Sequence, residues 1–315
     1  MAECLRESAA RSASYIRSMA ARSRAASATT AGSIGLASPA LFDVDCNLTH
    51  AALQGDAERL LAAARAARVR YWLVPGSSVA DSSAAIELSR KVSAAIGDGS
   101  RSVLPTAGVH PFLAAKQLET HSVEQVVASL RSMVPEVVAL GECGLDFSEG
   151  FPDPEVQMRL FEPQVDLACD LGMPIFLHER FAHDQLMSVL RSKSQLPRVL
   201  VHCFTGTAAE LQTYLDEGFF VSFSGLICRE EAGSGLRDAI ATVRPSLDRI
   251  MVETDAPYLG FPGCRASERT KAKAIYPNVP AALPAVVRRL ADVLGVDEKE
   301  LARQTTANAI QFFSH

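Results

Sequence analysis

The 315-residue chain lacks several features that would assign it to a class at once. It has no continuous apolar run of about 18 residues or more, the length that a helix needs to cross a bilayer, although 48% of its residues are hydrophobic. Its seven cysteines are odd in number and include no C-x-x-C pair, which excludes a simple disulfide framework and a structural zinc knuckle. It also lacks a basic excess, since the net charge is −5. The composition predicts a soluble globular protein of a reducing compartment that binds any phosphate locally.

The first 40 residues differ from the rest. They are rich in Ala, Ser and Arg, and no acidic residue occurs between Glu7 and Asp43. This composition is typical of a mitochondrial or plastid transit peptide, and also of a disordered tail. We therefore predict an N-terminal extension over residues 1–40 and one enzyme domain over residues 41–315. The predicted location is a mitochondrion or plastid, with cytoplasm or nucleus as the alternative.

From residue 41 onward, short apolar runs alternate with amphipathic segments. The eight runs are 41–46, 70–76, 103–109, 137–142, 174–178, 199–203, 219–223 and 249–254. Their starts are 20 to 37 residues apart, which is about the size of a βαβ unit. The pattern predicts a single-domain α/β protein with a (β/α)₈ TIM barrel, and a doubly wound open sheet is the alternative.

Polar residues gather where these runs end. They are Asp45 and Asn47 at the end of the first run, His110 after the third, Glu142, His178 and His202 in the fourth to sixth, and Asp255 after the eighth. In a barrel the carboxyl ends of the strands converge on one rim, whereas an open sheet would spread them apart. Imidazole nitrogens and carboxylate or amide oxygens are ligands for divalent cations. The sequence therefore predicts a metal site at the C-terminal rim.

Side-chain alternation gives a finer prediction. Successive side chains of a strand point to opposite faces. The acidic and amide residues of 43–47 should share one face, and Val44 and Cys46 the other. By the same rule, the thiols of Cys143 and Cys203 should point away from the rim.

Five motifs carry a family resemblance. "TAGVHP" (106–111), "GECGLDF" (141–147), "FLHER" (176–180), "VHCFTG" (201–206) and "ETDAPYL" (253–259) resemble, in this order, the TatD family of metal-dependent deoxyribonucleases. The similarity runs from about residue 42 to residue 312. In place of the common His-x-His after the first strand, the chain has Asp45-Cys46-Asn47, which resembles the branch with Asn at the second position.

The resemblance implies a distorted TIM barrel that hydrolyses DNA phosphodiester bonds with metal-activated water, as an exonuclease. It implies catalytic roles for Glu142 and Asp255, metal ligation by Glu142, His178, His202 and Asp255, and phosphate binding by His110 and Arg180. Asp45 and Asn47 are candidate ligands of a second, weaker ion. Their oxygen ligands favour Mg²⁺ or Mn²⁺, while the histidines also accept Zn²⁺. The expected partner is substrate DNA, with no membrane and no obligate protein partner.

Two other functions remain open from the residues. One is a hydrolase on a similar metal barrel that acts on an amide, lactone or phosphoester of a small molecule. The other is a catalytically weak barrel that serves as a binding partner. The motifs "GECGLD" and "HCFTG" favour the deoxyribonuclease, and the complete ligand set disfavours the weak barrel.

Overall fold

The computed structural model describes residues 39–96, 101–268 and 276–314. The predicted N-terminal extension, together with its proposed targeting role, lies almost entirely outside the described residues. Within the described ranges, no helix has both the length and the apolar character that crossing a membrane requires.

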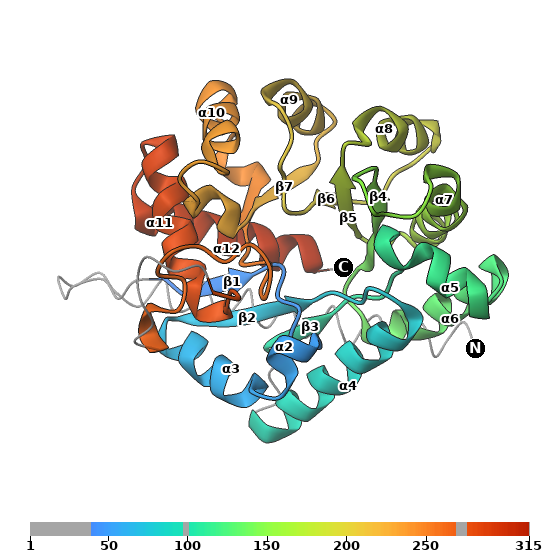
Figure 1. Cartoon of the computed structure of the whole chain (residues 1–315), viewed down its shortest axis with the longest axis horizontal. Coiled ribbons are helices and arrows are strands. Elements are labelled where there is room, and N and C mark those ends of the chain that lie inside the picture. Colours follow the sequence, from blue (N-terminus) through green and yellow to red (C-terminus); the bar gives the residue numbers. More distant parts are fainter. Residues whose placement is uncertain (1–38, 97–100, 269–275, 315) are drawn as a thin grey trace.

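Eight parallel strands form the centre of the molecule (Figure 1). They are β1 (Leu41–Asp43), β2 (Val69–Val74), β3 (Val103–Pro105), β4 (Leu140–Asp146), β5 (Ile175–Arg180), β6 (Val199–Val201), β7 (Phe220–Phe223) and β8 (Ile250–Val252). Ladders join β1-β2-β3 and β4-β5-β6-β7-β8 in chain order. Each predicted apolar run overlaps one strand, so the strand predictions are confirmed.

Backbone hydrogen bonds also link the two ladders at both seams. Between β3 and β4, the Val138 N–H donates to the Pro105 carbonyl at 3.0 Å. Between β8 and β1, the Val44 N–H donates to the Val252 carbonyl at 3.2 Å. The strands therefore close into a barrel, which confirms the predicted fold and excludes the alternative of a doubly wound open sheet.

Helices surround the strands (Figure 1). The α-helices are α2 (Ala51–Gln54), α3 (Ala57–Ala66), α4 (Val79–Ile96), α5 (Ala114–Thr120), α6 (Val123–Met133), α7 (Pro154–Leu171), α8 (His183–Ser192), α9 (Ala208–Asp216), α10 (Ser234–Val243), α11 (Leu283–Leu294) and α12 (Glu298–Phe313). Short 3₁₀ turns are η1 (Pro111–Leu113), η2 (Val134–Glu136), η3 (Gly225–Cys228), η4 (Leu247–Arg249), η5 (Ala266–Glu268) and η6 (Pro280–Ala282). Capping boxes fix the starts of α6 and α9, because each satisfies two otherwise free backbone groups.

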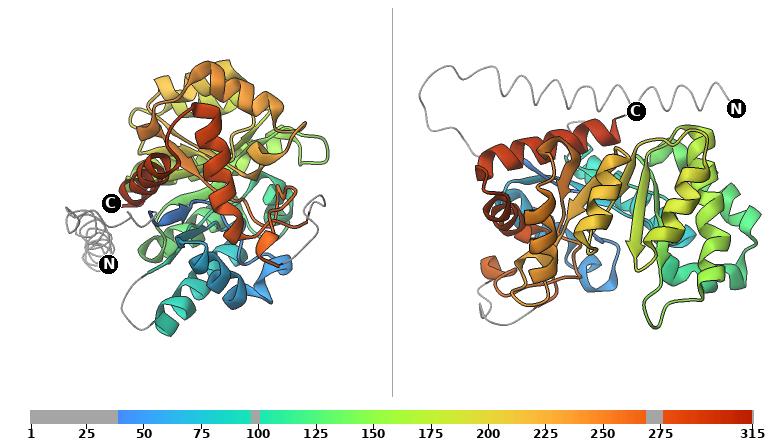
Figure 2. Two further views of the ribbon diagram at one scale, coloured as in Figure 1. Left: turned by 90° about the vertical axis from the view of Figure 1, so that its left-hand side faces the viewer. Right: turned by 90° about the horizontal axis from the view of Figure 1, so that it is seen from above.

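The barrel interior is filled by apolar side chains at its amino-terminal end. Phe42, Phe176, Leu200 and Met251 belong to one buried cluster. Four residues of α12 complete it: Ala309, Ile310, Phe312 and Phe313. Figure 2 (right) shows α12 lying across this end of the barrel. The opposite, carboxyl-terminal rim remains open for a site. Two residues beyond Phe176, on the same face of β5, comes His178. His202 follows directly after the end of β6, and its ring stacks on that of Phe176 with the centroids 4.7 Å apart.

The predicted alternation over residues 43–47 brings Asp45 and Asn47 together as expected, but it is wrong for Asp43 and Val44. Val44 packs inside the barrel, whereas Cys46 belongs to the core between strands and helices. The Asp43 carboxylate accepts hydrogen bonds from the Thr254 N–H and hydroxyl, both at 2.7 Å. The reason is that β1 ends at Asp43, so the following residues no longer alternate as a strand does.

Candidate metal centre and active site

Two glycines of β4 allow Glu142 to lie close to β5. Gly141 and Gly144 have φ values of +132° and +150°, which L side chains rarely adopt. A Cβ at Gly141 would lie 2.1 Å from the Phe176 carbonyl oxygen, and one at Gly144 would lie 1.8 Å from that of His178. The "GECG" sequence therefore permits the close strand approach that brings Glu142 beside His178.

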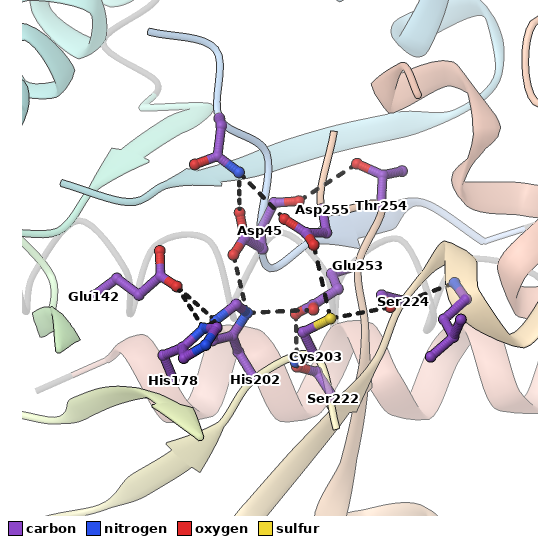
Figure 3. A network of polar contacts seen from close by, with 12 residues as sticks. Asp45, Glu142, His178, His202, Cys203, Ser222, Ser224, Glu253, Thr254 and Asp255 are labelled. Carbon is purple, nitrogen blue, oxygen red and sulfur yellow. Dashed lines mark hydrogen bonds and ion pairs between the residues drawn. The ribbon is translucent and has the colours of Figure 1, made fainter. Parts of the chain in front are cut away.

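Glu142 is the centre of the site. Its Oε1 atom lies 3.2 Å from His110 Nε2, 3.2 Å from His178 Nδ1 and 2.8 Å from His202 Nε2. Asp45 Oδ2 lies 3.0 Å from the other ring nitrogen of His202, Nδ1. We call these five residues the Glu142 cluster; Figure 3 shows how four of them, all but His110, converge from different strands and loops.

The cluster has the donor atoms that a divalent cation requires. Two ligand groups, His110–Glu142–His178 and Asp45–Glu142–His202, each place their donor atoms within 4.8 Å of one another and share Glu142. Asp45 Oδ2 and His202 Nδ1 are buried and lack hydrogen-bond geometry despite their 3.0 Å separation. Buried nitrogen and oxygen atoms without such partners are costly, and a cation bound by Asp45 Oδ2 would offset that cost for the carboxylate. The residues therefore fit a metal centre.

The pKa shifts of the buried carboxylates also favour a bound cation. Burial raises the pKa of Asp45 and of Asp255 well above the usual range, and Asp45 and Asp255 repel each other. Burial would also raise the pKa of Glu142, but the neighbouring imidazoles outweigh it and hold that pKa well below normal. Such a set of buried carboxylates is stabilised by positive charge.

A carboxylate that sequence reasoning did not assign orients His178. Asp146 Oδ2 lies 3.0 Å from His178 Nε2, which leaves Nδ1 facing Glu142. Burial alone would lower the pKa of His178, yet the hydrogen bonds to Asp146 and Glu142 raise it. Metal-binding histidines commonly bond a carboxylate in this way. Alternation along β4 places Asp146 on the face of Glu142, but the predicted run ended at Glu142 and so did not include it.

Glu253 is a second unassigned carboxylate. It is fully buried, and its Oε2 accepts a hydrogen bond from the Ser222 hydroxyl at 2.6 Å. Its Oε1 lies 3.4 Å from His202 Nδ1. Burial alone would lower the pKa of His202, but the negative charge of Glu142 and then of Glu253 raises it well above normal. Glu253 therefore stabilises the positive charge of His202 on the Nδ1 side of the ring.

Asn47 and Asp255 lie on the Asp45 side of the cluster. The Asn47 amide donates to Asp45 Oδ1 at 3.1 Å and to Asp255 Oδ1 at 3.4 Å. The Asp255 N–H also donates to the Asp45 carbonyl at 3.0 Å. The structure thus brings these predicted site residues together.

The prediction for Cys203 is wrong. Its thiol donates to the Ser224 hydroxyl at 3.3 Å and lies 3.7 Å from Asp255 Oδ2, so it faces the site (Figure 3). Because β6 ends at Val201 and Cys203 has a φ of +46°, strand alternation no longer applies there. Cys143, in contrast, is buried in the outer core as predicted.

A cavity of about 600 Å³ opens above the cluster, and we call it the rim cavity.

The two residues predicted to bind the substrate phosphate, His110 and Arg180, differ in position. His110 touches Glu142 directly, and burial lowers its pKa. Arg180, the exposed last residue of β5, lines the cavity wall. Among the described residues, no carboxylate lies within 4.0 Å of its guanidinium.

Comparisons with known proteins agree with this arrangement. The family model of TatD-related DNases matches residues 42–314. The chain is 37% identical to the 3′-5′ ssDNA/RNA exonuclease TatD of Erwinia tasmaniensis over 279 residues, which cover 87% of this chain and 100% of that protein. It is 36% identical to the Escherichia coli K12 exonuclease of the same name, with 87% and 98% covered. The crystal structure of YjjV, a TatD homologue from E. coli K12, superposes with a TM-score of 0.71 at 27% identity, covering 87% of this chain and 98% of YjjV. The chain therefore belongs to the family of TatD-related DNases.

Proposed function

We propose that this protein is a metal-dependent exonuclease that removes nucleotides from the 3′ end of single-stranded DNA. One observation carries the proposal: Glu142, at the floor of the open rim cavity, belongs to two ligand groups at once. Family membership makes the chain a hydrolase of phosphodiester bonds. The 3′ polarity and the single-stranded substrate are inferred from two relatives named as 3′-5′ ssDNA/RNA exonucleases, at 37% and 36% identity.

The residues divide the cation binding between two positions. Glu142 Oε1, His178 Nδ1 and His202 Nε2 lie within 3.3 Å of one another, so they would hold one ion firmly. Asp45, with Asn47 beside it, would hold a second ion more weakly. Their oxygens favour Mg²⁺ or Mn²⁺ at that position. When bound, the cation supplies Lewis acidity that activates water and offsets the charge of the phosphoryl group.

The protein's own side chains complete the reaction. Asp255, at the edge of the rim cavity, accepts a proton from the attacking water at a carboxylate oxygen. Arg180 offers a planar fork of N–H donors, which suits two phosphate oxygens at once. Because this guanidinium has no ion-pair partner among the described residues, it is available for a substrate phosphate. His110 also lines the rim cavity and would position the same group.

The test uses single-stranded DNA of about 20 nucleotides labelled at the 5′ end. Purified protein with Mg²⁺ or Mn²⁺ should give a ladder that shortens from the 3′ end, and EDTA should stop it. A substrate blocked by a 3′ phosphorothioate linkage is the matched control and should be degraded much more slowly. Internal fragments without a ladder would contradict the exonuclease proposal. Hydrolysis of small-molecule amides or lactones, with none of DNA, would favour the alternative hydrolase.

A further inference from the structure

A second cavity lies beside the rim cavity and belongs to no predicted site. It has a volume of about 500 Å³ and lies among the end of β5, the loop before α9, and α10. Helices α9 and α10 pack against each other at this edge of the barrel (Figure 1). Glu179, Arg180 and Thr205 line both cavities, so the two are adjacent across Arg180. We call it the α9–α10 cavity.

Phe181 lines this cavity and is largely exposed to solvent. Its exposed fraction is 73%, the highest among the large apolar side chains of the described residues. The other two that are strongly exposed, Phe112 and Tyr258, line the rim cavity. Phe181 also has a φ of +55°, which is uncommon for a bulky residue. The fold therefore holds an aromatic ring outward where burial would normally be favoured.

Arg180 connects this ring to the proposed reaction site. Its guanidinium carbon lies 5.3 Å from the centre of the Phe181 ring, within the range of a cation–π contact. A guanidinium beside an aromatic face is suited to bind a phosphate and to flank the base attached to it. Phosphate and base contacts thus lie next to each other along the chain.

The charged residues that line the α9–α10 cavity favour the binding of a base over the binding of a phosphate. Glu179, Glu210 and Asp238 line it, and Arg180 is the one cationic residue among its described lining. Glu179 is bonded to the Tyr214 hydroxyl at 2.9 Å and Glu210 to the Thr207 N–H at 2.6 Å, so their negative charges stay in place. These carboxylates repel a phosphate, whereas an uncharged base is tolerated and can stack on an aromatic ring.

We propose that the α9–α10 cavity is a nucleotide subsite in which the base next to the scissile linkage stacks on Phe181 while its phosphate binds Arg180. This proposal rests on the proposed nuclease function and specifies its substrate as an unpaired strand that extends beyond one nucleotide. To stack on Phe181, a base must not be stacked on its neighbours within a duplex. Such a contact discriminates little between sequences, because every base has a π-face. The subsite therefore favours single strands without reading their sequence.

The test compares Phe181→Ala with wild type on two substrates. Loss of one stacked base should raise KM for a single-stranded hexanucleotide about 5- to 150-fold. It should leave kcat/KM for bis(p-nitrophenyl) phosphate unchanged, because that diester is too small to reach beyond the rim cavity. The matched control Phe181→Trp should keep a KM near wild type, since it retains a stacking surface.

Binding is measured separately by fluorescence anisotropy of the labelled hexanucleotide in EDTA, where hydrolysis is not required. Weaker binding by Phe181→Ala, recovered in Phe181→Trp, supports the subsite even if the wild type releases no nucleotide, a result that would refute only the proposed function. Equal affinities for the hexanucleotide in all three proteins would overturn the subsite. A parallel loss of activity on both substrates would also overturn it, because the ring would then act on the metal centre.

Discussion

Replacing Asp45 by Asn tests whether the cluster binds a second cation. The substitution keeps the size of the side chain and removes one negative charge from the Asp45–Glu142–His202 group. Asp45 is fully buried and lies 3.0 Å from His202 Nδ1, so water screens its charge poorly. Two unit charges about 4 Å apart interact by about 4 kcal/mol at an effective dielectric constant of about 20. This is an upper bound, because the amide oxygen that replaces the carboxylate can still coordinate.

We therefore expect Asp45→Asn to raise the metal concentration for half-maximal activity about 10- to 100-fold. The first, firmly bound equivalent of metal should remain, since its proposed ligands Glu142, His178 and His202 do not change. The assay is DNA hydrolysis titrated with Mn²⁺ after dialysis, with metal content measured by mass spectrometry on the same samples. Asp238→Asn, which removes a carboxylate from the α9–α10 cavity, is the control for the change in net charge. Titrations of wild type and Asp45→Asn that superimpose would refute a second cation at Asp45.

Further predictions concern the support of the site and the N-terminal segment. Asp43→Ala should lower the free energy of unfolding by about 2–4 kcal/mol, because the N–H and hydroxyl of Thr254 lose their 2.7 Å acceptors; an unchanged urea midpoint would contradict this. Asp146→Asn should weaken metal binding about 10- to 100-fold through looser orientation of His178, and calorimetric titration with Mn²⁺ showing wild-type affinity would exclude that role. Deleting residues 1–38 should leave the DNA hydrolysis rate and Tm nearly unaltered, because the core and the site found among the described residues lie within 41–313. A fluorescent fusion of residues 1–38 that stays outside organelles would refute the transit-peptide prediction.

The barrel could be predicted because its signal is periodic. Each strand is a short apolar run, and the spacing between runs leaves room for one helix. The rim residues Asp45, Glu142, His178 and His202 followed from the same pattern, since they lie at or next to the ends of the first, fourth, fifth and sixth runs. The sequence could not show that β4 continues to Asp146, because the residues after Glu142 include Gly and Asp, which strands seldom contain.

The errors occurred where regular structure stops. Alternation assigns Cys203 to the outer face, yet β6 ends two residues earlier and the backbone of Cys203 is left-handed. Likewise, Asp43 at the last position of β1 accepts a hydrogen bond from Thr254 and does not share a face with Asp45. Phe181 carried no signal at all, because nothing in an isolated Phe after a strand distinguishes an exposed ring from a core residue. Such positions depend on tertiary contacts and not on local pattern.

The Glu142→Gln variant, measured for bound metal and for nuclease activity in the same preparation, tests whether the shared carboxylate binds the catalytic cations. The substitution preserves shape but removes the anionic oxygen that lies within 3.2 Å of three imidazoles. We expect the wild type to retain at least one equivalent of metal. The variant should lose it together with activity, by more than about 1,000-fold, at an unchanged circular dichroism spectrum. A Glu142→Gln protein that keeps its metal and its rate of DNA hydrolysis would contradict the metal centre proposed here.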